Sequence, residues 1–420
     1  MLAFALTTYA FMEMSNYKKY NKKYSLFNKF RNIQEFPKEL LDRKIDIVCD
    51  DIKNNHVETS IFMKEMFGGT DIKNVTKHEL HNAIIDNLFL TSSKNVNYEK
   101  VDSVISALES HLNHEFEENH HTDKKVGHIS VGADKLIAWY RPLAFDIFLK
   151  FLKMPSKLYF TYVLGFERHV IDNSIVVWIK KGSVNNDLNA TLFLPACIGG
   201  IIFYPYFVSK LDQTRTIFIL EIPGMSWNGY NDAIPPNMSK IANGIINTIS
   251  KHNIKNLDIV GHSFGTIVIS HIANECYHLI KQAGIKINKV VYVEGLLFYV
   301  RAFKTLGEID KSLYEVITGS HPSDIFTMAL FPRDLYVKFY IKRYLMLSNS
   351  VLCGESQMEK ECNIHAVMGK HDNKFITKDY VDYIDKKKLQ IKYKVFDHGI
   401  HGSFVWDSDI QQHVLDILNK

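Results

Sequence analysis

This chain lacks several features that would mark particular classes of protein. It has only 5 cysteines in 420 residues, and no two have the spacing of a metal site or a disulfide framework: Cys49, Cys197, Cys276, Cys353 and Cys362. A reducing, intracellular compartment is therefore the simpler expectation. The formal net charge is only +4. Since no basic stripe with interleaved aromatic residues accompanies it, we expect no nucleic acid partner.

The chain also has no hydrophobic run at its start that is long enough to cross a membrane. Leu2–Met12 is largely apolar, whereas a membrane-spanning helix needs about 20 residues. A signal peptide has its basic residues before the apolar run. Here they follow it, at Lys18, Lys19, Lys22, Lys23, Lys29 and Arg31. Residues 1–31 thus form an apolar and basic N-terminal segment.

Two interpretations of residues 1–31 stay open. The apolar part can lie in a lipid surface while the lysines meet anionic headgroups, which gives peripheral membrane contact. The segment can equally be an ordinary packing element. The protein is accordingly expected to be cytoplasmic or peripherally associated with a membrane.

The next part of the chain, residues 32–140, is mostly polar and charged. Within it, Val101, Val104, Ile105 and Leu108 have the spacing of one apolar helix face. A mainly helical accessory region is therefore predicted over residues 32–140.

The most informative motif is the pentapeptide Gly261–Gly265, which reads Gly-His-Ser-Phe-Gly. It lies between the apolar run Leu257–Val260, which predicts a strand, and Thr266–Val268, which begins a helical pattern. A strand, a Gly-x-Ser-x-Gly turn and a helix together describe a nucleophile elbow. This setting makes Ser263 the candidate nucleophile and leaves the backbone N–H of Phe264 at a helix N-terminus, where it can face a developing oxyanion.

A carboxylate partner is expected downstream, just after a strand. Ile364–Met368 predicts a strand that runs into a glycine turn, and Asp372 follows that turn. Its function would be to accept a hydrogen bond from a histidine and fix the tautomer of the imidazole. Glu294, which closes the apolar run Val290–Val293, is the second candidate for the same function.

The histidine should follow the last strand, predicted at Ile391–Phe396. Two candidates, His398 and His401, lie in the glycine-flanked loop after that strand. The order serine, acid, histidine along the chain gives the set its weight.

These residues resemble the α/β-hydrolase superfamily, and the resemblance runs from about residue 159 to residue 420. The strand Thr216–Ile222, a helix near Ser239–His252 and the elbow come in the expected order. Arg141–Leu143 resembles the segment before the core in a poorly characterised subgroup of large hydrolases, which extends the expected domain to 141–420. The resemblance implies an α/β fold with a mostly parallel sheet and helices on both faces. It also favours His401, because His-Gly-Ser-Phe before a terminal helix is similar to the final histidine loop of the family.

The resemblance places a second oxyanion donor after the strand Thr191–Leu194. Many hydrolases have His-Gly there, whereas this chain has Pro195 and Ala196. The backbone N–H of Cys197 is the expected donor, and Ala196 is the alternative.

A long segment separates the strand that ends at Glu294 from the strand at Ile364, far beyond the dozen or so residues that a crossover needs. It predicts a helical lid insert at about 296–360, over the sheet edge where open α/β folds bind ligands. Its aromatic and apolar residues suit a cover for an acyl substrate, or they pack the insert onto the core: Phe298, Tyr299, Phe303, Phe326, Leu330, Phe331, Tyr336, Phe339, Tyr340 and Tyr344.

The resemblance implies a serine hydrolase that cleaves a carboxylic ester, lipid or acyl esters included, through Ser263, Asp372 and His401 and an acyl-serine intermediate. The expected partner is a small-molecule or lipid ester substrate, and neither a metal nor an organic cofactor is implied. Two alternatives remain: an acyltransferase or thioesterase with the same triad, and a non-catalytic binding or scaffold protein with a hydrolase fold.

Overall fold

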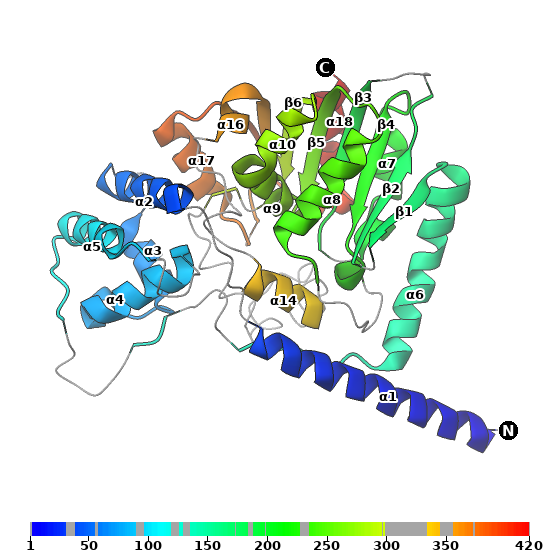
Figure 1. Ribbon diagram of the computed structural model, residues 1–420, viewed down its shortest axis with the longest axis horizontal. Coiled ribbons are helices and arrows are strands. Elements are labelled where there is room, and N and C mark those ends of the chain that lie inside the picture. The colour runs from blue at the N-terminus through cyan, green and yellow to red at the C-terminus, as the bar shows by residue number, and fades with distance from the viewer. Residues whose placement is uncertain are drawn as a thin grey trace.

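The computed structural model describes most of the chain, in ranges that together contain the sheet, the helices around it and the N-terminal helices (Figure 1). The described residues are 2–30, 38–54, 58–89, 96–118, 126–128, 135–172, 174–183, 188–197, 199–226, 235–295, 297–298, 334–344, 356–372 and 374–419.

Within these residues, eight strands form one sheet with the order β1-β2-β4-β3-β5-β6-β7-β8. The strands are β1 (Glu167–Asp172), β2 (Ile175–Lys180), β3 (Asn189–Leu194), β4 (Thr216–Glu221), β5 (Asn256–His262), β6 (Lys286–Val293), β7 (Asn363–Gly369) and β8 (Ile391–Phe396). Strand β2 runs antiparallel to β1 and β4, and the other neighbouring pairs are parallel. This order with an antiparallel second strand is the α/β-hydrolase fold, so the predicted fold class is confirmed.

Helices cover both faces of the sheet because successive strand residues point to opposite sides. In β2, Val177 belongs to one buried cluster and Trp178 to the other. The first cluster includes apolar side chains of α8 (Met238–Ser250), α9 (Phe264–His271), α10 (Tyr277–Gln282) and α17 (Thr377–Lys387). The second cluster includes those of α7 (Pro205–Lys210) and α18 (Ser408–Asn419). The central strands are therefore buried on both faces.

The N-terminal part of the chain is helical and lies beside the sheet. Its helices are α1 (Leu2–Lys29), α2 (Lys38–Lys53), α3 (Thr59–Met66), α4 (Lys77–Ile84) and α5 (Tyr98–Leu112), with a 3₁₀ turn at Ile72–Asn74 and a π turn at Ile85–Phe89. The predicted apolar face of α5 is buried. Figure 1 shows α2 to α5 as a group on one side of the molecule, and Tyr383 Oη of α17 donates to Asp51 Oδ2 of α2 at 2.7 Å. The group thus packs on the sheet domain through α17.

Helix α1 packs along the molecule through its C-terminal half. Tyr20 Oη and Tyr24 Oη donate to the carbonyls of Ala138 and Leu136, at 2.7 and 2.8 Å. After these contacts the chain enters α6 (Leu143–Leu158) and a π turn at Tyr159–Val163, which lead into β1. No helix of the described residues is long and apolar enough to cross a membrane.

The structure describes only parts of the predicted lid insert, namely residues 297–298, 334–344 and 356–360. Helix α14 (Leu335–Arg343) is buried on all sides, and α16 (Gln357–Glu361) leads into β7. Tyr336, Phe339, Tyr340 and Tyr344 of the insert, together with Phe298, belong to the core. These residues pack the insert onto the core, which is the second of the two interpretations of its aromatic residues. Tyr299, Phe303, Phe326, Leu330 and Phe331 lie outside the described residues, and the lid stays a prediction.

Candidate active site

Ser263 sits at a sharp turn between β5 and α9, with φ 50° and ψ −110°. A residue other than glycine rarely adopts this backbone conformation, and such strain persists only where the surroundings enforce it. Gly261 and Gly265 allow the neighbouring segments to pack closely enough to hold Ser263 in this conformation. A Cβ on Gly261 would lie 2.7 Å from the carbonyl carbon of Gly265, and one on Gly265 would lie 1.9 Å from the carbonyl oxygen of Leu194. The glycines are thus required by the close approach of β3, β5 and α9.

Two hydrogen bonds connect the three residues that the sequence singled out. Ser263 Oγ lies 3.1 Å from His401 Nε2, and His401 Nδ1 lies 3.0 Å from Asp372 Oδ2. The residues follow β5, β8 and β7, so all three stand at the carboxyl ends of parallel strands. The arrangement is the order of contacts that nucleophilic catalysis by a serine requires: hydroxyl, imidazole, carboxylate.

The carboxylate of Asp372 is held by its own loop. Its Oδ1 accepts hydrogen bonds from the backbone N–H groups of Lys374 and Phe375, at 2.8 and 3.0 Å. The other oxygen, Oδ2, remains directed at His401. The ring of Phe375 meets the imidazole of His401 edge-on, with ring centroids 5.2 Å apart. Asp372 and Phe375 thus fix the orientation of the imidazole from two sides.

The loops after β7 and β8 approach each other closely at two glycines. A Cβ on Gly369 would lie 2.5 Å from the carbonyl group of Gly399. The backbone N–H of His371 donates to the carbonyl of Gly399 at 2.8 Å. Because the loop that carries Asp372 is bonded to the loop that carries His401, the distance between the two side chains is set by the backbone.

The environment of His401 changes its proton affinity. Burial lowers the pKa of His401, but the charge of Asp372, the hydrogen bond to it and the charge of Glu294 together raise that pKa above its usual value. The imidazole therefore favours the protonated form more than a free histidine does, which suits a base that must hold a proton during the reaction.

The alternative histidine, His398, is bonded to a carboxylate of the terminal helix start, whereas His401 is bonded to the serine. Its Nε2 lies 2.6 Å from Asp407 Oδ2, and its side chain is 59% exposed. Asp407 also accepts from the backbone N–H groups that begin α18. His398 is therefore attached to the start of the terminal helix and is not the residue that the structure brings to Ser263.

The alternative acid, Glu294, holds the histidine loop. Its Oε2 accepts from the backbone N–H of Gly402 at 2.6 Å, and its Oε1 accepts from that of Phe404 at 2.9 Å. Glu294 has a positive φ of 45° and is 1% exposed. Glu294 directly follows β6, as expected, but Asp372 and not Glu294 makes the hydrogen bond to the imidazole of His401.

The sequence did not predict that further buried side chains would be hydrogen-bonded to Glu294 beside the site. His262 Nε2 lies 3.1 Å from Glu294 Oε2, and His262 Nδ1 lies 2.7 Å from Tyr204 Oη. Tyr204 Oη in turn accepts from the backbone N–H of Ala196 at 3.1 Å. His262 stood within the elbow motif, but nothing in the sequence pointed to Tyr204.

The donors and acceptors of this network assign its protons. An ionised carboxylate only accepts, so Nε2 of His262 carries the proton that is directed at Glu294. Nδ1 then accepts from the hydroxyl of Tyr204. Burial raises the pKa of Tyr204, which keeps that hydroxyl protonated, although the N–H of Ala196 acts in the opposite direction. We refer to Tyr204, His262 and Glu294 as the buried relay, since they connect the loop after β3 to the loop after β8.

The expected oxyanion donors lie at the elbow and in the loop after β3. Phe264 is the first residue of α9, where backbone N–H groups have no partner within the helix. Because Leu194 touches Gly265, the loop that contains Ala196 and Cys197 begins beside this helix end. The N–H of Ala196 is directed at Tyr204, which leaves Cys197 as the better candidate of the two. Its thiol is buried, and burial raises the pKa of that thiol.

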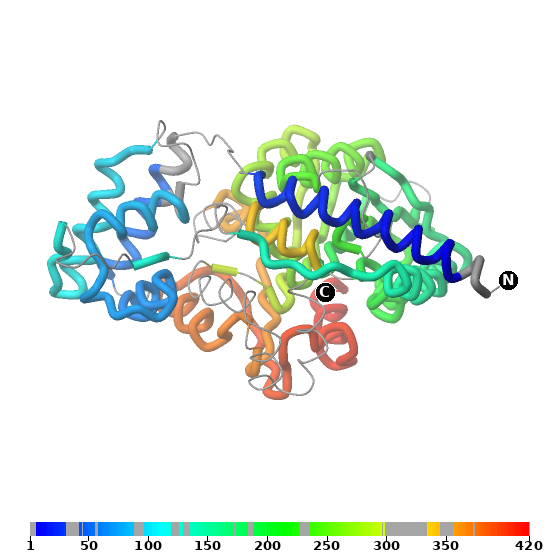
Figure 2. Tube along the Cα trace, turned by 90° about the horizontal axis from the view of Figure 1, so that it is seen from below, coloured from blue at the N-terminus to red at the C-terminus, as the bar shows by residue number. Residues whose placement is uncertain are grey.

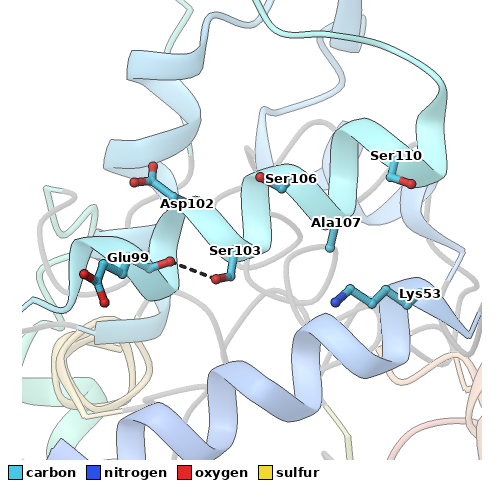
Figure 3. Close-up of a pocket in the computed structure, with 7 residues that line it drawn as sticks. All are labelled: Lys53, Glu99, Asp102, Ser103, Ser106, Ala107 and Ser110. Carbon is cyan, nitrogen blue, oxygen red and sulfur yellow. Dashed lines mark hydrogen bonds between the residues drawn. The ribbon is translucent and has the colours of Figure 1, made fainter.

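A separate hollow lies between α2 and α5, in the N-terminal part of the chain (Figure 3). In Figure 3, Lys53 extends from α2 toward α5, and the side chains along α5 are small or acidic. Ser103 Oγ donates to the carbonyl of Glu99 at 2.8 Å, so this serine is bonded within its own helix. The hollow holds no arrangement like that around Ser263.

No protein-family model matches this sequence, and no curated protein matches it. Solved structures match it at TM-scores of 0.42 to 0.44. Carboxylesterase CesB from Bacillus subtilis is 11% identical, with a TM-score of 0.42 over 65% of this chain and 98% of that one. Naproxen esterase from Bacillus subtilis is 13% identical, with a TM-score of 0.43 over 66% and 100%. A membrane phospholipase A, described as a bacterial virulence factor, is 13% identical, with a TM-score of 0.44 over 65% and 92%.

At TM-scores this low, these matches carry no argument about the fold or the substrate of this chain. The α/β-hydrolase fold is defined here by the strand order and by the strand, turn and helix around Ser263.

Proposed function

We propose that this protein is a serine hydrolase that cleaves a carboxylic ester, with Ser263 as nucleophile, His401 as base and Asp372 as the acid that orients the base. The observation that carries the proposal is the unbroken pair of hydrogen bonds from Ser263 Oγ through His401 to Asp372, at 3.1 and 3.0 Å. Stability of the fold does not require a strained serine, an imidazole and a buried carboxylate to be hydrogen-bonded in this order, whereas catalysis by a serine does.

In the proposed reaction, Ser263 Oγ attacks the ester carbonyl carbon while its proton moves to His401 Nε2. Asp372 stabilises the imidazolium that forms. Collapse of the tetrahedral intermediate breaks the bond to the alcohol oxygen, which takes the proton from His401, and leaves an acyl group on Ser263. Water then attacks the acyl carbon with His401 again as base, and the carboxylic acid is released.

The negative charge of the tetrahedral intermediate requires two donors. We assign them to the backbone N–H groups of Phe264 and Cys197. The position of Phe264 at the start of α9 supports the first, because its N–H points out of the helix end and the helix dipole favours negative charge there. The place of Cys197 after β3, beside the elbow, supports the second.

The substrate is proposed to be an ester with an apolar acyl group, lipid esters included. Aromatic rings adjoin the reacting side chains: Phe375 meets His401 edge-on, and Phe264, next to Ser263, packs edge-on against Tyr340 of α14, with centroids 5.7 Å apart. Residues 296–360 are the proposed lid, within a hydrolase domain of residues 141–420 that follows an accessory region, 32–140, and the N-terminal segment, 1–31.

Two other functions fit the same residues. An acyltransferase or thioesterase would form the same acyl-serine and pass it to another nucleophile or release it from a thiol. A binding or scaffold protein with this fold would not use Ser263 at all. The strained backbone of Ser263 speaks against the second, because a residue with no chemical function gains nothing from that conformation.

The deciding experiment is covalent labelling with a fluorophosphonate probe, which reacts with activated serines. Wild-type protein should be labelled, Ser263→Ala should not, and Ser103→Ala on the exposed side of α5 should be labelled like wild type. Unlabelled wild-type protein and Ser263→Ala are then assayed with p-nitrophenyl esters of increasing chain length and with an acyl thioester. Folded wild-type protein that takes no label would exclude the hydrolase and leave the binding protein.

A further inference from the structure

Helix α6 has its apolar side chains on the outside. Its exposed apolar residues recur every three to four positions and continue into the π turn that follows, with Phe151 65% and Tyr162 80% exposed. We call them the α6 face: Ile147, Phe148, Phe151, Leu152, Met154, Leu158, Tyr162 and Val163. Monomeric soluble proteins rarely expose contiguous apolar surface of this kind.

The inner side of α6 is the polar one. Its buried residues are Asp146, Leu149 and Lys153. Asp146 accepts from Arg141, and Lys153 donates to the carbonyl of Ser226 and lies 3.6 Å from Glu221. Ionic contacts therefore attach the helix to the sheet domain. This is the reverse of an ordinary amphipathic helix on a globular core, in which the apolar side faces inward.

The first half of α1 continues the exposed apolar surface. Leu6, Phe11, Met12 and Met14 are 60%, 70%, 49% and 52% exposed. Glu13 Oε2 accepts from the backbone N–H of Leu143 at 2.9 Å, so this part of α1 meets the start of α6. Figures 1 and 2 both show the N-terminal end of α1 projecting beyond the rest of the chain.

The charges on these two helices are of one sign where they are exposed. Each helix has a single acidic residue, Glu13 in α1 and Asp146 in α6. Glu13 is bonded to Tyr9, Tyr140 and Leu143, and Asp146 is buried. The exposed charged residues of the two helices are lysines: Lys18, Lys19, Lys22, Lys29 and Lys150.

We propose that the α6 face and the first half of α1 form one docking surface for a membrane that contains anionic lipids. The two helices lie in the headgroup region, with their phenylalanine, leucine and methionine side chains in the acyl boundary and the lysines on lipid phosphates or carboxylates. Exposed charges of a single sign distinguish this occupant from a second copy of the chain, whose own lysines would be brought against these. The docking does not depend on the proposed ester hydrolysis.

The test is flotation of the full-length protein with two kinds of vesicle. One is pure phosphatidylcholine, and the other contains roughly 30 mol% phosphatidylserine as the anionic lipid. We expect binding to the anionic vesicles that weakens as salt rises. The double variant Phe148→Asp, Phe151→Asp and the single variant Phe11→Asp should each bind at least ~10-fold more weakly. The triple variant Lys18→Gln, Lys19→Gln, Lys22→Gln should lose about fivefold per lysine, and only with the anionic vesicles.

The control is Tyr98→Asp, which adds the same charge as Phe11→Asp at an exposed aromatic residue of α5, a helix on the far side of the molecule. It should bind like wild type, and circular dichroism should show that every variant is folded. Wild-type protein that stays with the lipid-free fraction would overturn the proposal. Vesicle binding that is unchanged in the Phe148→Asp, Phe151→Asp variant would also overturn it. A protein that does not bind vesicles, but forms a dimer that this variant dissociates, would show that the surface binds a second copy of the chain instead.

Discussion

The carboxylate of Glu294 accepts the backbone N–H of Gly402 at 2.6 Å, and Gly402 directly follows His401. Glu294 thus anchors the backbone next to His401, the proposed base, although it does not bind the imidazole. Asp372 fixes the imidazole, whereas Glu294 fixes the loop that carries it. Since Glu294 is buried and also bonded to His262, the loop after β8 is attached to the elbow through side chains of the core.

Replacing Glu294 by glutamine tests this anchoring. The amide keeps the size of the side chain but loses the charge and cannot accept from Gly402, Phe404 and His262 as a carboxylate does. The charge of Glu294 is one of the causes that raise the pKa of His401. We expect kcat to fall about 10–100-fold with little change in KM, and the rise of kcat/KM with pH to move to lower pH. Glu167→Gln, at an exposed carboxylate of β1, should change neither. An unaltered pH profile in a slower Glu294→Gln enzyme would mean that the residue acts on stability alone.

Replacing Asp372 by asparagine tests the triad itself. The pKa of His401 is raised in the folded protein, and only the neutral imidazole can act as base, so wild-type kcat/KM should rise through a pKa above the usual ~6.5 of histidine. Without the charge of Asp372, burial dominates and that pKa should fall. We expect a loss in kcat of about 10⁴-fold together with a shift of the rise toward lower pH. Rates measured from about pH 5 to pH 9 check both. A loss below tenfold would argue that another group orients His401.

Tyr204→Phe interrupts the buried relay at its other end. It removes the acceptor of the Ala196 N–H and the donor to His262 Nδ1. Leaving such buried groups without a partner costs about 1–3 kcal/mol each, so the free energy of unfolding should fall by at least that amount in a urea titration. Because Ala196 precedes Cys197, kcat should also fall while KM changes little. Tyr206→Phe, at an exposed tyrosine of α7, is the matched control and should leave stability and kcat unchanged.

Gly265→Ala tests the close approach at the elbow. The new Cβ would lie 1.9 Å from the carbonyl oxygen of Leu194, a backbone atom that cannot turn away. Overpacking of this kind costs about 1–3 kcal/mol or more, and displacement of β3 from α9 should abolish labelling by the fluorophosphonate probe. Gly127→Ala, where a Cβ meets nothing within 4 Å, should keep both stability and labelling. Full labelling of Gly265→Ala would contradict the packing described here.

The proposed catalytic residues could be found from the sequence because each one lies in the turn or loop that follows a strand. Ser263 comes after β5, Asp372 after β7 and His401 after β8, and the carboxyl ends of parallel strands meet at one edge of a sheet. The choice between His398 and His401 could not be made on spacing, because both lie in the same loop. It depends on Asp407, which binds His398 at the start of α18.

Other features had no local signal. Tyr204 contacts His262 although 58 positions separate the two residues. A tyrosine in an apolar stretch looks the same in the sequence whether or not its hydroxyl has a buried partner. The orientation of α6 was equally hidden, because an amphipathic pattern gives two faces but does not say which one is buried. The ion pairs with Arg141 and Glu221 decide it.

By itself, the sequence determined the strand positions, the glycines of the elbow and the chain order of serine, acid and histidine, since these depend on residues close together along the chain. Tertiary structure alone decided that Asp372 binds His401, that Glu294 holds the histidine loop, and that α6 turns its apolar side outward. Those outcomes depend on contacts between residues that are distant along the chain, such as Glu294 and Gly402, which are 108 positions apart. The linear sequence does not record which of several distant groups will bind a given partner.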